Sequence, residues 1–453
     1  MRFYNYFRIS KPSASKVPPE QVDKTYRSLR NKTFWGITVA YSLYYICRMT
    51  LSVVKQPVID GGILTASQLG VIGSALLFAY AIGKFMNGFL ADYCNIRRFM
   101  GAGLVVSALL NLVMGAFGLM QSTLGISSLV LFVLFSVTWC INGWVQSMGA
   151  PPAVISLSRW VPLRTRGTYY SIVCSTPYLG KFLSMVLTGG VVAALGWQYG
   201  FLFATLGGLI GAAVIYVFVS DTPESCGLPS VQELSGEQMR KSDSMPTREL
   251  QKHVIRHPGI WIIALSCSFV YITQYGLSNW GVLFLQKAKG FSLTQAVWII
   301  GFSESFGIAG TVLSGWLSDK VFHGNRALPV ALSGAVCLAA LCAFMFLGGS
   351  AVMNIVYVGV FSLAIGVVYC IVGGLMALDI VPRKATGAAL GIVGISSYVA
   401  AGLQDIVSGF LIQGGTDGVD YNFTAVALFW IAACVVSVVL PVVAWRHLRQ
   451  KIV

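Results

Sequence analysis

Long apolar stretches alternate with short polar segments along nearly the whole chain of 453 residues. A helix that spans a membrane needs about 20 consecutive apolar residues, and the pattern predicts about twelve such helices. Six of them lie on each side of the long polar segment 220–258. The predicted stretches are 33–54, 66–91, 98–119, 126–149, 168–195, 198–219, 259–286, 292–317, 328–347, 351–377, 385–413 and 421–445. The pattern is typical of an all-α membrane protein with two six-helix halves.

The polar segments divide this predicted fold into five parts. The expected parts are a cytoplasmic N-terminal arm at 1–32, an N-terminal six-helix half at 33–219, a cytoplasmic linker at 220–258, a C-terminal six-helix half at 259–446 and a cytoplasmic tail at 447–453. The first apolar stretch follows the polar arm without a small-residue cleavage site. We therefore expect it to be a retained helix and not a signal peptide.

Composition and charge agree with a chain embedded in a lipid bilayer. Hydrophobic residues make up 56% of the chain and charged residues 10%, whereas a soluble domain carries about 25% charged residues. A net charge of +15 can indicate a nucleic-acid partner, but the basic residues concentrate in the arm, in alternate short loops and in the tail. This distribution follows the positive-inside rule and predicts that both termini are cytoplasmic. No nucleic-acid partner is expected.

The sequence does not show the residue clusters of a metal site or an enzyme. Most of the ten cysteines lie inside apolar stretches, and no CxxC or Cys/His cluster occurs. Neither a disulfide framework nor a metal site is therefore expected. No set of nucleophile, base and acid is visible, and no phosphate-binding glycine loop. The prediction is a protein without catalytic residues and without a cofactor.

One five-residue pattern occurs once in each predicted half. Gly-Phe-Leu-Ala-Asp at 88–92 and Gly-Trp-Leu-Ser-Asp at 315–319 each close an apolar stretch and are followed by basic residues. A membrane chain with two similar halves typically has a transport path between them, so the first interpretation is a transporter. We expect the aspartates to form helix-end clamps with the basic residues, and breaking such a clamp is compatible with gating. The expected clamp residues are Asp92, Arg97, Asp319 and Arg326.

Charged residues inside the predicted spans are candidate functional residues, because charge in lipid is costly. They are Arg48, Lys84, Lys181, Glu304 and Asp405. Tyr41, Tyr45 and Arg48 have spacings that place them on one helix face, and Lys84 lies one turn after Tyr80. A guanidinium fork with phenolic hydroxyls beside it suits a phosphate or a carboxylate. The alternative for Arg48 is a buried structural ion pair.

Five segments resemble one known family. They are 17–30 (VPPEQVDKTYRSLR), 44–48 (YYICR), 143–152 (GWVQSMGAPP), 221–229 (DTPESCGLP) and 318–326 (SDKVFHGNR). In these segments together the chain resembles the organophosphate:phosphate antiporter family of the major facilitator superfamily, over nearly its whole length. The resemblance implies that superfamily's fold. It also implies exchange of a small phosphorylated molecule for inorganic phosphate by alternating access.

The resemblance also implies a binding site. In the family, arginines on helices 1 and 7 jointly hold the phosphate; the first matches Arg48, and a lysine on helix 2 matches Lys84. Gln274 stands where the helix-7 arginine is expected, and Pro177 lies near the position of a family histidine. We expect Arg48 to be the main anion-binding residue. The further expected contacts are Tyr41, Tyr45, Tyr80, Lys84, Tyr271, Gln274 and Tyr398.

The missing arginine leaves three interpretations open. Losing one charge-assisted contact costs roughly 1.5–3 kcal/mol, or about ten- to a hundredfold in affinity. In the first interpretation, Lys181 replaces the arginine. In the second, the substrate is a less charged organic anion. In the third, the protein binds weakly and acts as a membrane sensor of hexose phosphate that partners a sensor kinase.

The superfamily fold, in which helix 5 faces helix 8 and helix 2 faces helix 11, suggests two charge pairs between the halves. They join Lys181 to Glu304 and Lys84 to Asp405. The alternative is that each charge faces a watery cavity. The two carboxylates also leave proton-coupled symport open, because buried carboxylates can titrate near neutral pH. A pair between Lys84 and Asp405 would disfavour that mechanism.

The leading prediction is a monomeric carrier in the bacterial cytoplasmic (inner) membrane. It exchanges a sugar phosphate, glycerol 3-phosphate or a phosphoglycerate for inorganic phosphate. The alternatives are a transporter of a less charged organic anion and the sensor described above.

Overall fold

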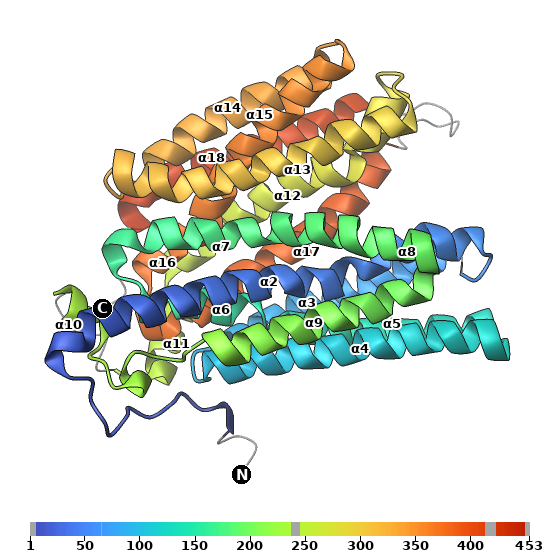
Figure 1. Ribbon diagram of the computed structural model, residues 1–453. Helices are drawn as coiled ribbons and strands as arrows, with labels where there is room; N and C mark the ends of the chain where they lie inside the picture. The colour runs from blue at the N-terminus through green and yellow to red at the C-terminus, as the bar shows by residue number, and fades with distance from the viewer. Residues whose placement is uncertain (1–5, 65, 237–244, 413–422, 449–453) are drawn as a thin grey trace. The chain divides into compact units, whose positions relative to one another are not determined.

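The computed structural model describes residues 6–64, 66–236, 245–412 and 423–448. Regular structure in these ranges is helical, apart from an isolated β-bridge between Arg8 and Cys94. The chain divides into two compact units (Figure 1). Unit 1 comprises Met1–Leu163, Leu179–Arg248 and Arg383–Gly391, and unit 2 comprises Arg164–Tyr178, Glu249–Pro382 and Ile392–Val453. Each unit therefore includes a short segment from the other half of the sequence.

Unit 1 is built mainly from the helices of the N-terminal half. They are η1 (Pro19–Gln21), α2 (Val22–Asp60), α3 (Ala66–Ala91), α4 (Ile96–Leu124), α5 (Ser128–Gln146), α6 (Ala150–Trp160), the π-helix η2 (Ser184–Thr188), α8 (Gly189–Leu195), α9 (Trp197–Phe218), η3 (Glu224–Cys226) and α10 (Val231–Ser235). The short helix η7 (Arg383–Ala385) joins unit 1 from the C-terminal half. Helix α4 packs against α5 and α9, α2 against α9, and α3 against α5 (Figure 1).

Unit 2 is built mainly from the helices of the C-terminal half. They are α12 (Pro258–Lys287), α13 (Leu293–Trp316), the π-helix η5 (Leu317–Val321), α14 (Ala327–Phe346), α15 (Ala351–Cys370), the π-helix η6 (Ile371–Leu375), α16 (Met376–Ile380) and α18 (Phe423–Leu448). Helix α15 packs against α13 and α14, and α18 packs against α12 and α14. Gly310 of α13 lies directly against the backbone of Leu363 in α15, an approach that a side chain would prevent.

Three further helices contribute residues to both units. They are α7 (Leu163–Leu183), α11 (Thr247–Arg256) and α17 (Thr386–Ile412). Residues 164–178 of α7 belong to unit 2, whereas the first residues of α17 belong to unit 1.

Local sequence sets where several helices begin and end. Asn95 precedes α4, and its side chain accepts a hydrogen bond from Arg98 N at 2.9 Å. Ser292 precedes α13 in a capping box with Gln295. Each such cap satisfies backbone donors that have no partner within the helix and contributes roughly 1 kcal/mol. Gly125 ends α4 with φ +65°, a left-handed conformation that glycine adopts without steric cost.

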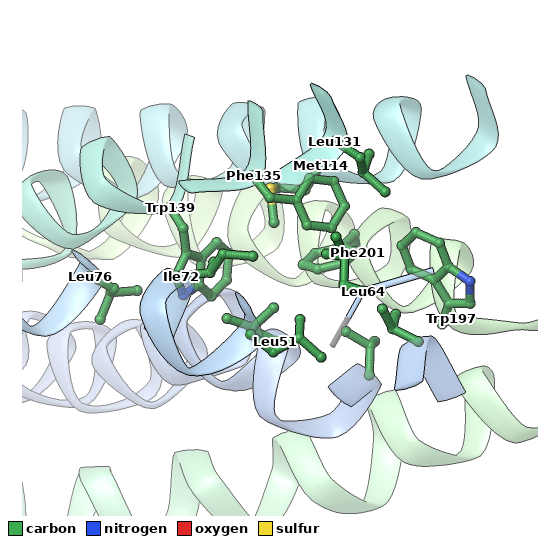
Figure 2. Packing of buried hydrophobic residues seen from close by; sticks show 13 residues of the cluster. Leu51, Leu64, Ile72, Leu76, Met114, Leu131, Phe135, Trp139, Trp197 and Phe201 are labelled. Atoms are coloured by element: carbon green, nitrogen blue, oxygen red, sulfur yellow. The ribbon is translucent and has the colours of Figure 1, made fainter. Parts of the chain in front are cut away.

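A cluster of buried aromatic side chains joins α5 to α9 in unit 1 (Figure 2). Phe135 and Phe201 are fully buried, with their ring centroids 6.0 Å apart in an edge-on arrangement. Trp139 and Trp197 contact Phe201 in the same way, at 6.0 and 6.4 Å. Each edge-on pair contributes roughly 0.5–1.5 kcal/mol beyond the area that it buries. The cluster thereby fixes α9, the helix against which α2 packs.

The described residues include ten helices that are long and apolar enough to cross a membrane. They correspond to ten of the predicted stretches. The other two stretches, 168–195 and 292–317, are also helical but include side chains outside the described set. The first span, Pro19–Val54, begins inside the predicted arm because α2 starts at Val22. The prediction of an all-α membrane protein is confirmed.

The N-terminal arm is hydrogen-bonded to the rest of unit 1 through Asp221, the first residue of a segment that carried the family resemblance. Its side chain is 2% exposed. One carboxylate oxygen accepts a hydrogen bond from Ser10 N at 2.8 Å, and the other accepts from Ile96 N at 3.0 Å and from Arg159 Nη1 at 2.6 Å. A single carboxylate therefore ties together the arm, the start of α4, the end of α6 and the start of the linker.

Candidate functional site

The strongest candidate for anion binding is Arg48 of α2, in unit 1. Its side chain is buried, with 7% of the residue exposed. The guanidinium carbon lies over the Tyr80 ring of α3, 4.0 Å from the centroid, and 5.6 Å from the centroid of Tyr45. Tyr41 packs edge-on against Tyr45, with centroids 5.7 Å apart. Aromatic faces attract a guanidinium and fix its position, while its N–H donors lie in its own plane and suit a bidentate oxyanion.

Lys84 approaches the same ring as Arg48. Its Nζ atom lies 6.0 Å from the Tyr80 centroid, and the side chain is half-buried. The two cationic groups are therefore at most about 10 Å apart. At such a separation both positive charges attract an anion bound near the Tyr80 ring, because Coulomb attraction in a low-dielectric environment is still appreciable over this distance.

A buried amide network supports the turn of α2 that carries Arg48. Asn111 of α4 and Asn142 of α5 donate to Cys47 O at 3.1 and 3.3 Å, and Gln146 of α5 donates to Tyr44 O at 3.2 Å. All three amide residues are at most 3% exposed. Buried polar networks of this kind rigidify the backbone that they contact. The sequence analysis did not select these three amide residues. The available signal was the spacing of four between polar residues inside an apolar segment, as for Asn142 and Gln146.

In unit 2, Tyr271 of α12 lies in a cluster of tyrosines. Its ring stacks on that of Tyr275, with the centroids 5.5 Å apart. The centroid of the Tyr369 ring of α15 lies 5.6 Å away, and the Tyr398 ring of α17 is edge-on with its centroid at 5.4 Å. The hydroxyl of Tyr271 donates to that of Tyr369 at 3.4 Å. The predicted contacts Tyr271 and Tyr398 are therefore neighbours, in surroundings rich in neutral hydroxyl groups.

Gln274, at the position where the resemblance predicts arginine, contacts a residue that sequence reasoning did not select. Its Nε2 atom donates to the hydroxyl of Tyr178 in α7 at 2.8 Å. Its Oε1 atom is buried and has no hydrogen-bond partner among the described residues. Both residues belong to unit 2. Tyr178 directly follows Pro177, which lies near the position of the family histidine. That neighbourhood was the signal in the sequence that could have identified Tyr178 as a site residue.

The predicted charge pairs stay predictions. Lys181 lies in α7 and is half-buried, whereas the side chains of Glu304 and Asp405 lie outside the described residues. The predicted site residues thus form one group in unit 1, around Arg48, and one in unit 2, around Tyr271 and Gln274.

In the repeated five-residue pattern, both aspartates accept hydrogen bonds from the backbone of another helix. In unit 1, Asp92 accepts hydrogen bonds from Gly387 N at 2.7 Å and Ala388 N at 3.1 Å, in the first turn of α17. In unit 2, Asp319 accepts from Thr168 N at 2.8 Å, in the second turn of α7, whereas the Asp92 contacts lie at a helix N-terminus. Carboxylates are favoured there because helix N-termini carry unpaired N–H groups and a partial positive charge. These helix partners were not predicted from the motif.

The basic residues after the two aspartates behave differently. Arg326 forms an ion pair with Asp319 at 2.9 Å and a second pair with Asp379 at 2.7 Å. Burial acts to lower the pKa of Arg326, but the two carboxylates outweigh this effect and raise the pKa above its ordinary value. Arg97 lies 5.9 Å from the centroid of the Tyr216 ring, and its contact with Asp92 stays a prediction. Asp379 of α16 was not among the predicted site residues and is a full member of the network.

Comparison with known proteins agrees with this fold. Residues 37–404 match the family model described as Major Facilitator Superfamily. Among solved structures, the Fucose:proton symporter FucP of E. coli aligns with a TM-score of 0.67 at 13% sequence identity, covering 92% of this chain and 98% of that one. The likeness to that structure concerns the fold alone.

Two of the relatives that this chain matches over most of its length have names that refer to phosphorylated compounds. The chain is 29% identical to the glycerol-3-phosphate transporter of Bacillus subtilis, covering 96% of each chain. It is 30% identical to a probable hexose phosphate transport protein of Chlamydia pneumoniae, covering 84% of this chain and 85% of the relative. It is also 25% identical to the membrane sensor protein UhpC of Escherichia coli, covering 84% and 86%. The chain belongs to the major facilitator superfamily, in its organophosphate transporter family.

Proposed function

We propose that this protein is a carrier that exchanges a small phosphorylated metabolite for inorganic phosphate by alternating access. It works as a monomer in the bacterial inner membrane, with both termini in the cytoplasm. The observation that carries the proposal is the placement of Arg48, a buried arginine held over the ring of Tyr80 within a membrane-spanning helix. The names of two relatives, which refer to glycerol 3-phosphate and hexose phosphate, support the class of substrate.

The chemistry of the Arg48 group suits a phosphate. The guanidinium stays charged at every physiological pH and offers N–H donors in a fixed fork that matches two phosphate oxygens. Lys84, near the same ring, adds a point charge that does not demand a particular geometry. The amides of Asn142 and Gln146 fix the backbone beneath Arg48 and reduce the reorganisation that binding requires.

The clamps in the two units support a role in alternating access. Asp92 and Asp319 each accept a hydrogen bond from the backbone of a helix whose sequence belongs to the other half. Such contacts have discrete made and broken arrangements, which is the requirement for a gate that a bound substrate can bias.

The test is phosphate counterflow in proteoliposomes that are loaded with inorganic phosphate and receive labelled phosphate outside. Wild type should take up label in a saturable manner. Arg48→Ala should abolish uptake, and Arg48→Lys should retain a small part, because it keeps the charge and loses the fork. Arg256→Ala is the matched control, since Arg256 is exposed in α11, and it should exchange phosphate like wild type.

Each other outcome has a defined meaning. Saturable exchange that survives in Arg48→Ala would contradict the role of Arg48. Absence of exchange in well-folded wild-type protein, with retained binding of hexose phosphate, would favour the sensor alternative. Exchange that requires a proton gradient would favour symport. Labelling of single cysteines placed in the arm and in the tail, in intact cells, tests the proposed orientation.

A further inference from the structure

Unit 2 contains a small polar cavity at the position where the family resemblance predicts an arginine. Its polar lining comes from Tyr178, Gln274, Ser278 and Ser362, and the remaining lining is apolar. The residues come from α7, α12 and α15, together with Ile300 of α13. The lining residues therefore come from four helices and all belong to unit 2.

The cavity has the size of a single hydroxyl group. Its volume is about 20 Å³, whereas one water molecule needs roughly 10–15 Å³ on the same measure. A phosphate group, with a central atom and several oxygens, does not fit without displacement of the lining. Gly307 limits such displacement, because a Cβ atom there would lie 2.7 Å from the Tyr178 ring, which shows how closely that ring packs on α13.

The hydrogen-bonding groups of the cavity are incomplete. Gln274 donates from Nε2 to the Tyr178 hydroxyl at 2.8 Å, and its buried Oε1 atom has no partner among the described residues. Turning the amide over would exchange the roles of the two atoms and would still leave one of them without a partner. A hydroxyl group both donates and accepts, so it satisfies the amide in either orientation.

The cavity is also uncharged over the described lining. The residues 258–278 of α12 include no Asp, Glu, Lys or Arg, and the lining residues are neutral. A carboxylate or a second phosphate would lose its hydration here without gaining a cationic partner, which is strongly unfavourable. A neutral hydroxyl loses far less hydration and gains the amide.

We propose that Gln274 and Tyr178 bind a hydroxyl group on the uncharged part of the substrate and thereby select a phosphate monoester of a polyol or sugar. Esters that carry a second anionic group, such as a carboxylate, are selected against. This inference rests on the proposed function, in which the substrate is a small phosphorylated metabolite. The replacement of arginine by glutamine thus changes the specificity of this position from anion to hydroxyl.

The experiment is equilibrium binding to the purified full-length protein, with inorganic phosphate, glycerol 3-phosphate and 3-phosphoglycerate as probes. Wild type should bind glycerol 3-phosphate more tightly than 3-phosphoglycerate. Gln274→Leu should weaken the binding of glycerol 3-phosphate about three- to tenfold, because one net hydrogen bond is lost. The affinity for inorganic phosphate should stay unchanged. Tyr178→Phe should act in the same direction. Gln274→Arg should reverse the preference between the two esters.

Gln404→Leu is the matched control, because Gln404 of α17 is also a buried glutamine whose Oε1 lacks a partner among the described residues, but it does not line this cavity. It should leave the ratio of affinities unchanged. If Gln274→Leu weakens the binding of inorganic phosphate and of glycerol 3-phosphate equally, the inference is overturned and the proposed function stays in place. The same holds if wild type prefers 3-phosphoglycerate. A wild-type protein that binds none of the three probes would overturn both.

Discussion

Asp92, at the end of α3, accepts a hydrogen bond from the backbone N–H of Gly387 at 2.7 Å, across 295 residues of sequence. Its second carboxylate oxygen accepts from Ala388 N at 3.1 Å, so both oxygens bind the first turn of α17. Asp319 has the corresponding relationship with Thr168 N in unit 2. Both copies of the pattern therefore place a carboxylate on the backbone N–H of a helix from the other half of the sequence, and in unit 1 this is the N-terminus of α17.

Removing the charge of Asp92 should destabilise unit 1. Asp92→Asn keeps the size of the side chain but weakens the bonds to Gly387 and Ala388 and the attraction to the helix N-terminus. We expect a loss of roughly 1–2 kcal/mol in the free energy of unfolding, measured by thermal unfolding in detergent. Asp23→Asn, at an exposed position in the first turn of α2, is the control. Identical unfolding of Asp92→Asn and wild type would contradict this role.

The close approach of α3 and α17 should tolerate no added side chain at Gly88. A Cβ atom there would lie 2.6 Å from Gly387 O and 2.9 Å from Gly391 Cα, both backbone atoms that cannot move alone. Gly88→Ala should therefore cost roughly 1–3 kcal/mol. Gly402→Ala, in α17 with nothing within 4 Å among the described residues, should instead be neutral or stabilising by up to about 1 kcal/mol. The unfolding temperatures of Gly88→Ala and Gly402→Ala, measured in parallel, test this prediction. Equal temperatures would contradict a close backbone approach at Gly88.

The network around Arg326 should be a major source of stability in unit 2. Arg326→Gln leaves Asp319 and Asp379 without their shared cation. We expect a loss of roughly 2–4 kcal/mol, less than for a fully buried pair because the Asp379 side chain is 29% exposed. Lys320→Gln removes an exposed positive charge one residue after Asp319 and should change the unfolding temperature little. Similar effects of the two substitutions would show that only net charge matters.

The arm should open locally when Asp221 loses its charge. Asp221→Asn weakens the bonds from Ser10 N, Ile96 N and Arg159 at once, while the helices keep their packing. Hydrogen exchange measured by mass spectrometry should therefore become faster in the peptide that contains Ser10, with the exchange of α4 beyond its first turn unchanged. Glu233→Gln affects only the cap of α10 and serves as the control. Unchanged protection of the arm in Asp221→Asn would refute this account.

Lys289 should titrate well below an ordinary lysine. Burial lowers its pKa to about 8, although its hydrogen bonds to Leu347 O and Asn354 Oδ1, at 3.0 and 2.6 Å, favour the charged form. Because the unfolded chain keeps this proton up to about pH 10.5, the unfolded state binds more protons between about pH 8 and 10.5. The contribution of Lys289 to the free energy of unfolding therefore rises with pH across that window.

Isotope-labelled methylation of the lysines, followed by NMR titration, measures this pKa directly. One resonance should titrate near pH 8 and disappear in Lys289→Arg. It should persist in Lys287→Arg, which replaces the exposed lysine two residues earlier. A titration of every lysine resonance near pH 10 would contradict the prediction.

The sequence by itself determined the membrane class, the helical architecture and most positions of the helices. These features follow from hydropathy and from caps such as Asn95, which act over one or a few helical turns and can therefore be read locally. Helical spacing and the cost of charge in lipid also selected Arg48 with Tyr45, and Lys84 with Tyr80, as candidate residues. The sequence further indicated that Gln274 departs from the family pattern.

Only the tertiary structure decided which residues complete those groups. Tyr178 is separated from Gln274 by 96 residues and Gly387 from Asp92 by 295, so neither contact leaves a periodic signal in the chain. Arg326, just before α14, likewise pairs with Asp379 of α16 across 53 residues of sequence. Hydropathy and helical period specify which face of a helix is buried, but the partner of that face depends on packing among helices that are remote in sequence.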